Sequence, residues 1–229
     1  MNEGTSGVAG PFGLEQLVER ASGVAAPGRR RLLGMTGAPG AGRSALAVQL
    51  VDALGDSAAL VSMDGFHLAN AVLLALGRRD RKGAADTFDV AGYVVLLERV
   101  RTQTDDIIYA PEFDRALEES VGSAIPIATD TPLIVTEGNY LLLEEGGWQH
   151  VKALLDETWF VDPSEQVRQQ WLIRRHEQYG LSHERARQWA LGTDQRNAEL
   201  VNRTRAAATL VISVIDPGLP AQPAPSPRR

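Results

Sequence analysis

Cysteine is absent from the 229 residues of the sequence. Its absence excludes disulfide bonds, thiolate metal sites and cysteine nucleophiles, and it is typical of a reducing compartment. Long hydrophobic runs are also missing, because the longest, such as Leu210 to Ile215, are far too short to span a bilayer. The first residues lack the basic-then-apolar pattern of a signal peptide. These absences predict a cytoplasmic protein without a membrane partner.

The sequence also lacks an excess of positive charge. It has 23 Lys and Arg against 29 Asp and Glu, for a formal net charge of -6. Such a surface is unlike that of a protein that holds a nucleic-acid backbone, although positive charge can still gather locally around an anionic ligand. Apolar residues make up 44% of the chain and charged residues 23%, as in an ordinary globular protein. We therefore expect one globular domain with no nucleic-acid partner.

The composition divides the chain into three parts. Residues 1–29 form an expected leader with one short helix at 14–21, and residues 30–215 form the expected main domain. From Asp216 on, five prolines interrupt the sequence, and such a composition cannot build a packed segment. We expect residues 216–229 to form a disordered, proline-rich tail.

Short apolar runs alternate with helical patterns in the main domain. The predicted strands are residues 31–36, 58–63, 106–110, 132–136, 158–161 and 209–212. The predicted helices are residues 42–54, 90–102, 148–155, 163–179, 183–191 and 194–207. Asp162 is the expected N-cap of the fourth helix and Gly180 its stop, and Ser182 is the expected cap of the fifth. The alternation predicts an α/β fold of three layers, a mostly parallel central sheet with helices on both faces.

The first predicted strand leads directly into a glycine-rich loop. The loop has the sequence Gly37-Ala38-Pro39-Gly40-Ala41-Gly42-Arg43-Ser44 and is followed by Ala45. Its spacing is that of the phosphate-binding P-loop (the Walker A motif), G-x-x-x-x-G-K-[ST], in which the Ser hydroxyl is placed to bind Mg²⁺. Glycines let backbone N–H groups turn inward and cradle phosphate oxygens. A strand-to-helix turn without a ligand is the alternative, but the strand before the loop and the helix after it favour phosphate binding.

Arg43 departs from the motif, which has lysine at this position. Lysine delivers a compact point charge, whereas arginine is planar and bulkier, so the exchange is not neutral. Two consequences stay open at this point. The protein binds phosphate and turns over slowly, or its neighbouring loops have adjusted to arginine.

Two carboxylates follow two further predicted strands. Asp64 comes at the end of strand 58–63, and Glu137 comes at the end of strand 132–136. Parallel sheets bind ligands beyond the carboxyl ends of their strands. There Asp64 can accept the proton of an attacking hydroxyl, and Glu137 can face Mg²⁺. Each is also an ordinary turn residue when taken alone, but a phosphate loop at a third strand end favours one common site for ATP and Mg²⁺.

Five segments in this order give the chain a specific resemblance. They are residues 37–44, 63–68 (Met-Asp-Gly-Phe-His-Leu), 81–89 (Arg-Lys-Gly-Ala-Ala-Asp-Thr-Phe-Asp), 111–115 (Pro-Glu-Phe-Asp-Arg) and 136–142. Over residues 31–215 the chain resembles the phosphoribulokinase/uridine kinase family of P-loop kinases, in a branch similar to pantothenate kinase and fructose kinases. The resemblance implies a P-loop NTPase fold. It also implies ATP-dependent transfer of the γ-phosphoryl group to a hydroxyl of a sugar, a nucleoside or a pantothenate-like acceptor.

The resemblance further implies roles for individual residues. Asp64 matches the catalytic base, and Glu137 matches the acid that serves the metal together with Ser44. The segment 163–180 matches a lid, whose Arg168 and Arg175 reach the nucleotide. The resemblance thus implies four catalytic residues, which are Asp64, Glu137, Arg43 and Arg175. The residues that match the acceptor-binding region, beside Asp64, are His67, Arg81, Lys82, Asp114, Arg115, Asn139 and Tyr140. The residues that match later nucleotide-binding positions are Asp194 and Asn197.

Plainer interpretations stay open beside these roles. His67 also fits a satisfied interior histidine, and Arg81 and Lys82 also fit a solvated charged run. A degenerate kinase that holds nucleotide without turnover stays open because of Arg43. A GTPase or a motor ATPase is disfavoured, since the chain lacks Asn-Lys-x-Asp and Thr-Lys-x-Asp and carries an acceptor-type Asp-Gly-Phe-His. A homodimer is an expectation that rests only on the frequency of symmetric dimers.

Overall fold

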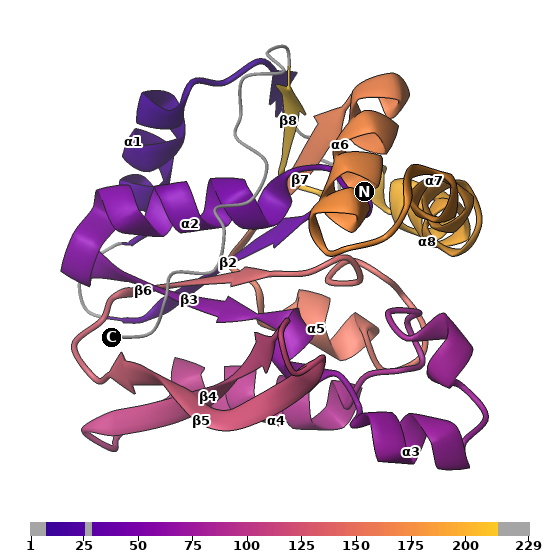
Figure 1. Ribbon diagram of the computed structural model, residues 1–229. Helices are drawn as coiled ribbons and strands as arrows, with labels where there is room; N and C mark the ends of the chain where they lie inside the picture. The colour runs from indigo at the N-terminus through magenta and orange to yellow at the C-terminus, as the bar shows by residue number, and fades with distance from the viewer. Residues whose placement is uncertain (1–7, 26–28, 215–229) are drawn as a thin grey trace.

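The computed structural model describes residues 8–25 and 29–214. Its central sheet has six strands in the order β1-β8-β7-β2-β6-β3, and every neighbouring pair is parallel (Figure 1). The strands are β1 (Val8–Gly10), β2 (Arg31–Thr36), β3 (Ala58–Ser62), β6 (Leu133–Glu137), β7 (Glu157–Pro163) and β8 (Leu210–Val214). Five of the six were predicted to within one or two residues at each end. Strand β1 was not predicted, because three residues are too few to show an apolar pattern.

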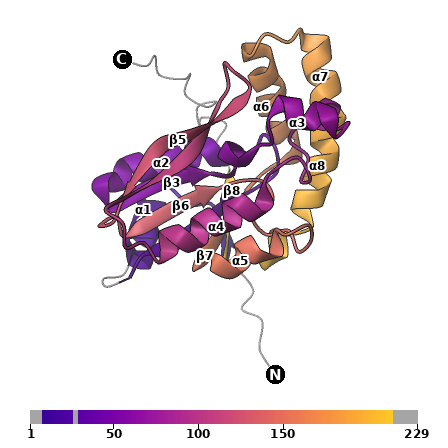
Figure 2. The ribbon, with the colours of Figure 1, turned by 90° about the horizontal axis from the view of Figure 1, so that it is seen from below.

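Helices cover both faces of this sheet. Consecutive side chains of a strand point to opposite faces, so Leu33 packs with one buried cluster and Leu32 with another. The first cluster includes α1 (Leu14–Val24) and α2 (Arg43–Leu54), and the second includes α4 (Val90–Arg101) and α5 (Gln149–Leu154) (Figure 2). The predicted three-layer α/β architecture is therefore confirmed.

The strand predicted at 106–110 does not belong to the central sheet. It is the start of β4 (Ile107–Asp114), which pairs antiparallel with β5 (Glu119–Ala128) in a separate two-stranded sheet. An apolar run does not tell which sheet a strand will join. Strand β5 was missed because Gly122 and Pro126 interrupt its pattern and only one of its ten residues is buried. The hairpin lies close to the central sheet, since a Cβ added to Gly65 would stand 2.5 Å from the Pro111 carbonyl oxygen.

Three helices near the end of the domain pack on one another. They are α6 (Glu165–Gln178), α7 (His183–Leu191) and α8 (Thr193–Asn202). The predicted cap of α6 is wrong: Asp162 lies in β7, and the Ser164 hydroxyl accepts the N–H of Val167 instead. A polar residue on each side of Pro163 made the choice ambiguous in the sequence. Ser182 does cap α7, and Gly180 follows α6 with a φ of 89°.

Two other helical segments differ from the sequence predictions. The short helix α3 (Asn70–Ala75) was not predicted. The helix predicted at 194–207 is divided into α8 and a 3₁₀ turn at Arg205–Ala207. The predicted leader helix is present as α1, while the rest of the leader up to residue 7 and the predicted disordered tail lie outside the described residues. Across 8–25 and 29–214, no helix has the length and the hydropathy needed to cross a membrane.

Candidate active site

Three strand ends meet at one edge of the central sheet. Strand β6 lies between β2 and β3, so Glu137 at its end has Met35 on one side and Ser62 on the other. The phosphate loop follows β2, and Asp64 follows β3. The sheet topology therefore brings the loop and both acids together, as the alternation of strands and helices in the sequence predicted.

The Gly37–Ser44 loop runs into the N-terminus of α2. Gly40 and Gly42 both have a φ of 83°, a conformation that favours glycine. A Cβ on Gly40 would also stand 2.8 Å from the Arg168 carbonyl oxygen and from the Leu172 Cβ of α6. The first N–H groups of α2 have no acceptor within the helix and carry the positive end of its dipole. The loop can therefore bind an anion, and α6 packs directly on it.

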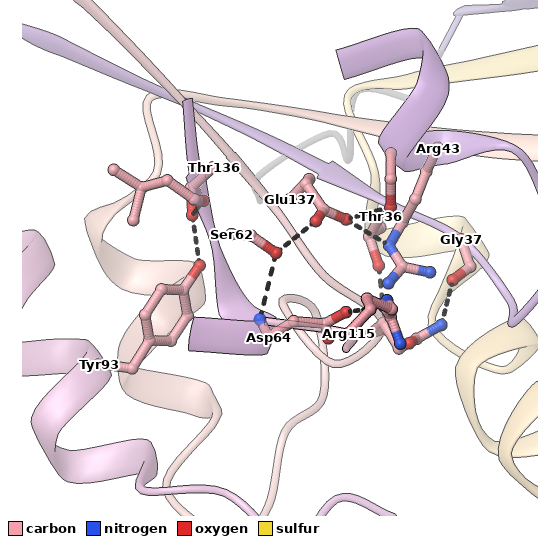
Figure 3. Close-up of polar contacts among 12 residues, drawn as sticks. Thr36, Gly37, Arg43, Ser62, Asp64, Tyr93, Arg115, Thr136 and Glu137 are labelled. Atoms are coloured by element: carbon pink, nitrogen blue, oxygen red, sulfur yellow. Dashed lines mark hydrogen bonds and ion pairs between the residues drawn. The ribbon is translucent and has the colours of Figure 1, made fainter. Parts of the chain in front are cut away.

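The carboxylate of Glu137 is held by three donors, of which Arg43 and Ser62 are labelled in Figure 3. Its Oε2 accepts from Arg43 Nε at 2.9 Å and from Ser44 Oγ at 3.0 Å, and its Oε1 accepts from Ser62 Oγ. The side chains of Arg43 and Glu137 are only 8% and 4% exposed. Arg43 thus balances a buried carboxylate, and its guanidinium also borders the cavity described below.

Asp64 is linked to the same group of residues. Its N–H donates to Ser62 Oγ at 3.2 Å, and its Oδ2 accepts from Arg115 Nη2 at 2.7 Å (Figure 3). Burial opposes ionisation of Asp64, but the positive charges around it, that of Arg115 first, outweigh burial and lower its pKa to about 2. Its Oδ1 has no hydrogen bond within the described part of the chain. A charged carboxylate with one oxygen available can accept a hydrogen bond from a substrate hydroxyl.

His67 is fixed beside Asp64 in an aromatic wall. Its ring lies 4.1 Å from that of Phe88 and 4.7 Å from that of Phe113, measured between centroids. Nδ1 lies 2.9 Å from the Asp64 carbonyl oxygen, which makes Nδ1 the protonated nitrogen and leaves Nε2 as an acceptor. Burial lowers the pKa of His67, so the ring is neutral near pH 7. His67 is both well packed and a wall of the cavity, so its two sequence interpretations are compatible.

A cavity of about 380 Å³ opens beside these groups. The predicted site residues that line it are Pro39, Arg43, Asp64, His67, Lys82, Arg115, Asn139, Arg175, Asp194 and Asn197. Its walls come from the phosphate loop, the hairpin, the segment after α3, and α6 to α8. Residues far apart in the sequence therefore form one cavity next to the phosphate loop.

Four residues predicted for this site lie elsewhere. Arg168 is 2% exposed and donates to the Pro39 carbonyl at 2.8 Å and to Glu165, so its guanidinium fixes α6 to the phosphate loop instead of facing the cavity. Arg81 pairs with Asp86 on the exposed surface. The sequence could not separate these arginines from Arg175, because spacing on a helix does not tell which neighbour a side chain meets.

The other two residues outside the cavity support its walls. Asp114 Oδ1 accepts the N–H groups of Ala116 and Leu117 and so shapes the turn between β4 and β5. Tyr140 is 1% exposed and donates through its hydroxyl to the Gly83 carbonyl at 2.6 Å. Both therefore contribute to packing around the site and not to the cavity lining.

The structure also adds residues that the sequence analysis missed. Ser62, which joins the two acids, stands two residues before Asp64 near the end of β3, and strand alternation could have indicated it. His176 lines the cavity and its Nε2 lies 2.8 Å from Asp194 Oδ2. Other unpredicted lining residues are Arg79, Gly83, Phe88, Phe113, Glu118, Tyr179, Leu181 and Trp189. Gly83, Phe88 and Phe113 lie inside segments 81–89 and 111–115, which carry the family resemblance, whereas the others come from segments without a motif and are identified only by the fold.

The oxygen atoms at this edge of the sheet suit a magnesium ion as ligands. Ser44 offers a hydroxyl oxygen 3.0 Å from a carboxylate oxygen of Glu137. Mg²⁺ prefers oxygen ligands and usually takes one or two protein groups together with substrate phosphates and water. Within residues 8–25 and 29–214, no three His, Asp or Glu side chains form a complete metal cage. The residues present suit a metal that arrives with a nucleotide.

The Arg115→Met variant is expected to change the pH dependence of any reaction that uses Asp64. In the unchanged protein the lowered pKa keeps this carboxylate charged at every pH above about 4, and the charge is lost only as the pH falls towards about 2. Burial raises the pKa of Asp64, and without Arg115 less positive charge opposes this effect. The acid limb of kcat/KM should therefore move towards neutral pH. The control is Arg99→Met, which removes an exposed arginine of α4 outside the cavity. An acid limb of Arg115→Met equal to that of this control would contradict the assignment.

Comparisons with known proteins agree with this geometry. No protein-family model matches the chain. An ATP-dependent kinase-like protein of Aspergillus versicolor is 34% identical over 152 residues, which cover 62% of this chain and 88% of the relative. A protein of Schizosaccharomyces pombe named putative uridine kinase is 30% identical over 179 residues, which cover 73% of this chain and 75% of the relative. The crystal structure of a putative fructose transport system kinase from Silicibacter sp. TM1040 is 32% identical with a TM-score of 0.78, and the match covers 87% of this chain and 98% of that one.

Proposed function

Because this chain belongs to the phosphoribulokinase/uridine kinase family of P-loop kinases, we propose that it transfers the γ-phosphoryl group of ATP to a hydroxyl of a small acceptor. The acceptor classes that fit are a sugar, a nucleoside or a pantothenate-like alcohol. The observation that carries the proposal is the continuous set of hydrogen bonds from Ser44 through Glu137 and Ser62 to Asp64. These contacts support the proposal because they link the Gly37–Ser44 loop to the acid proposed to serve the metal and to the acid proposed to accept the proton.

In this proposal the phosphate loop and α6 hold the nucleotide. The N–H groups at the start of α2 bind the β- and γ-phosphates, and Arg175 on α6 borders the same cavity. Asp194 and Asn197 line it from α8, on the nucleotide side. Mg²⁺, when bound through Ser44 with Glu137 behind it, supplies charge neutralisation at the phosphates. The lid segment 163–180, which contains α6, excludes water, which would otherwise take the phosphoryl group.

Asp64 has the role of orienting the acceptor and receiving its proton. The acceptor oxygen forms a bond to the γ-phosphorus while the bond from that phosphorus to the β,γ-bridging oxygen breaks, and ADP leaves with the electron pair. A carboxylate with a pKa of about 2 is a weak base for an alcohol in the ground state. The hydroxyl becomes acidic only as the new bond forms, so its proton passes to Asp64 Oδ1 late in the step.

The test is a screen for ADP release by the purified protein with Mg²⁺-ATP and a panel of sugars, nucleosides and vitamin alcohols. We expect release that depends on at least one acceptor and that yields its phosphate ester, seen by mass spectrometry. ATP binding without acceptor-dependent release across the panel would overturn the proposal. Size-exclusion chromatography of the same purified sample tests the predicted homodimer. Cell fractionation tests the predicted cytoplasmic location.

One observation favours a second candidate, a nucleotide-binding protein without turnover. Arg43, in the lysine position of the motif, is committed to the buried carboxylate of Glu137. If this pair persists when nucleotide binds, Arg43 does not follow the transferring phosphate. ATP affinity equal in the presence and absence of all acceptors, with no ester formed, would favour this candidate.

The Arg43→Lys variant tests what the arginine contributes to the proposed phosphoryl transfer. Lysine keeps the positive charge next to Glu137 and restores the compact charge of the motif. We expect acceptor-dependent turnover to stay the same or to rise, measured as kcat at saturating ATP. A fall of more than about tenfold, roughly 1.4 kcal/mol in the barrier, would mean that the site is built around the planar guanidinium.

A further inference from the structure

Positive charge exceeds negative charge on the walls of the cavity. The cationic side chains that line it are Arg43, Arg79, Lys82, Arg115 and Arg175, and the carboxylates are Asp64, Glu118 and Asp194. Five of these groups are matched within the protein. Arg43 pairs with Glu137, Arg115 with Asp64, and Asp194 with His176. The Nζ of Lys82 lies 3.8 Å from Glu119 Oε2 and donates to Asn70 Oδ1 at 2.9 Å. Arg79 and Arg175, in contrast, have no hydrogen bond or ion pair from their side chains within the described residues. The protein thus presents unmatched cations to the cavity.

Arg175 and Lys82 both lie close to other positive charges. Burial lowers the pKa of Arg175, and the nearby charges of Arg115 and Arg43 lower it further. Burial also lowers the pKa of Lys82, where Glu119 opposes the shift and the charge of Arg79 adds to it. Like charges that share a cavity raise the free energy of the empty protein, and an anion placed between them relieves this repulsion.

The two unmatched arginines come from different walls. Arg175 lies on α6, the helix that packs on the phosphate loop, so the phosphates of ATP account for it. Arg79 lies in a 3₁₀ turn after α3 and so borders the cavity from a segment other than α6–α8. Lys82 follows directly, and its Nζ donates to the Glu118 carbonyl at 2.6 Å and lies 5.1 Å from the centre of the Phe113 ring. Arg79 and Lys82 therefore belong to the acceptor side of the cavity.

We propose that the acceptor carries an anionic group, a carboxylate or a phosphate, that Arg79 and Lys82 hold while its hydroxyl faces Asp64. The proposal rests on the kinase function above and narrows its acceptor class. Phe113 contacts both ends of this arrangement, since Arg115, the partner of Asp64, has its Cζ 5.2 Å from the same ring centre. A short molecule can thus reach both ends, with its carbon skeleton against Phe113 and His67. A bulky neutral nucleoside would leave Arg79 without a partner.

The test compares matched acceptors that differ in charge. The pairs are glycerate and glycerol, pantothenate and pantothenol, and ribose 5-phosphate and ribose. We expect the anionic member of at least one pair to have a kcat/KM at least tenfold higher, and the carboxylate and phosphate pairs tell the two anions apart. Higher kcat/KM for the neutral members would overturn the inference while leaving the kinase function in place.

The Arg79→Met variant is the second arm. A charge-assisted hydrogen bond accounts for roughly a 10- to 100-fold effect, so kcat/KM for the anionic acceptor should fall by that factor, mainly through KM. The neutral member of the pair should be unaffected. Arg187→Met, which removes an exposed arginine of α7 outside the cavity, is the matched control. Equal losses for charged and neutral acceptors in Arg79→Met would overturn the proposed contact.

Calorimetry keeps this inference separate from the kinase function. Glycerate, pantothenate and ribose 5-phosphate are titrated into the protein with Mg²⁺-ADP present. If one of these anions binds and Arg79→Met weakens its binding by at least tenfold, the anion site is supported, whether or not any acceptor releases ADP. Failure of every acceptor to release ADP would contradict only the kinase function. Absence of binding by all three, together with absence of their turnover, would overturn the anion site.

Discussion

Asp64→Asn is expected to lower acceptor-dependent turnover by roughly 10²- to 10⁴-fold, the range for loss of a positioned proton acceptor. Asparagine keeps the size of the side chain and one oxygen for Arg115, but it cannot take the proton that leaves the acceptor hydroxyl. The phosphate loop is formed by other residues, so the dissociation constant for Mg²⁺-ATP should change little. The measurement is kcat at saturating acceptor, with ATP affinity from calorimetry on the same samples.

The control for this variant is Asp80→Asn. Asp80 is an exposed carboxylate in the charged segment after α3, and it does not line the cavity. Its replacement should leave kcat and ATP affinity unchanged. If Asp64→Asn kept turnover within about tenfold of the unchanged protein, Asp64 would lose its proposed role, since a tenfold loss accounts for only about 1.4 kcal/mol.

Glu137→Gln is expected to cost about 3–5 kcal/mol of the free energy of unfolding. The amide keeps the shape of the side chain, but Arg43 is left as a buried charge without a counter-charge, because both side chains are nearly inaccessible to water. Turnover should also fall, since the amide no longer supports a metal at Ser44. Urea denaturation followed by fluorescence measures the loss.

A double variant tells whether the unpaired charge causes this loss. Replacing a buried ion pair by apolar residues of similar volume is often close to neutral for stability. Arg43→Met together with Glu137→Leu should therefore be more stable than Glu137→Gln alone, although it should be inactive. A double variant that is less stable than the single one would show that the hydrogen bonds to Ser44 and Ser62 matter more than the charge pair.

The parts of the site that were predictable are those fixed by the ends of parallel strands. An apolar strand precedes each of three features: the phosphate loop that ends at Ser44, Asp64, and Glu137. A parallel sheet brings the carboxyl ends of its strands to one edge. The sequence did not reveal the partners of the charges. Arg168 and Arg175 lie on one helix seven residues apart, yet the first fixes the phosphate loop and the second faces the cavity. Their difference depends on how α6 packs, which is a tertiary property.

The acceptor side was less predictable for a related reason. Strand β5 and helix α3 have weak sequence signals, yet they place Glu118 and Arg79 at the cavity. Arg79 stands in a run of charges that, taken from the sequence alone, is most simply a solvated surface. Only the folded arrangement of the hairpin and the segment after α3 shows that Arg79 faces a cavity and has no ion pair or hydrogen bond from its side chain among residues 8–25 and 29–214.

The central claim is that Ser44, Glu137 and Asp64 serve one reaction centre, and a crystal structure with Mg²⁺ and a non-hydrolysable ATP analogue tests it most directly. We expect the γ-phosphate between the N-terminus of α2 and the carboxylate of Asp64, with the metal on the Ser44 hydroxyl and Glu137 behind it. A nucleotide bound elsewhere, or a γ-phosphate separated from Asp64 by protein atoms, would contradict the account.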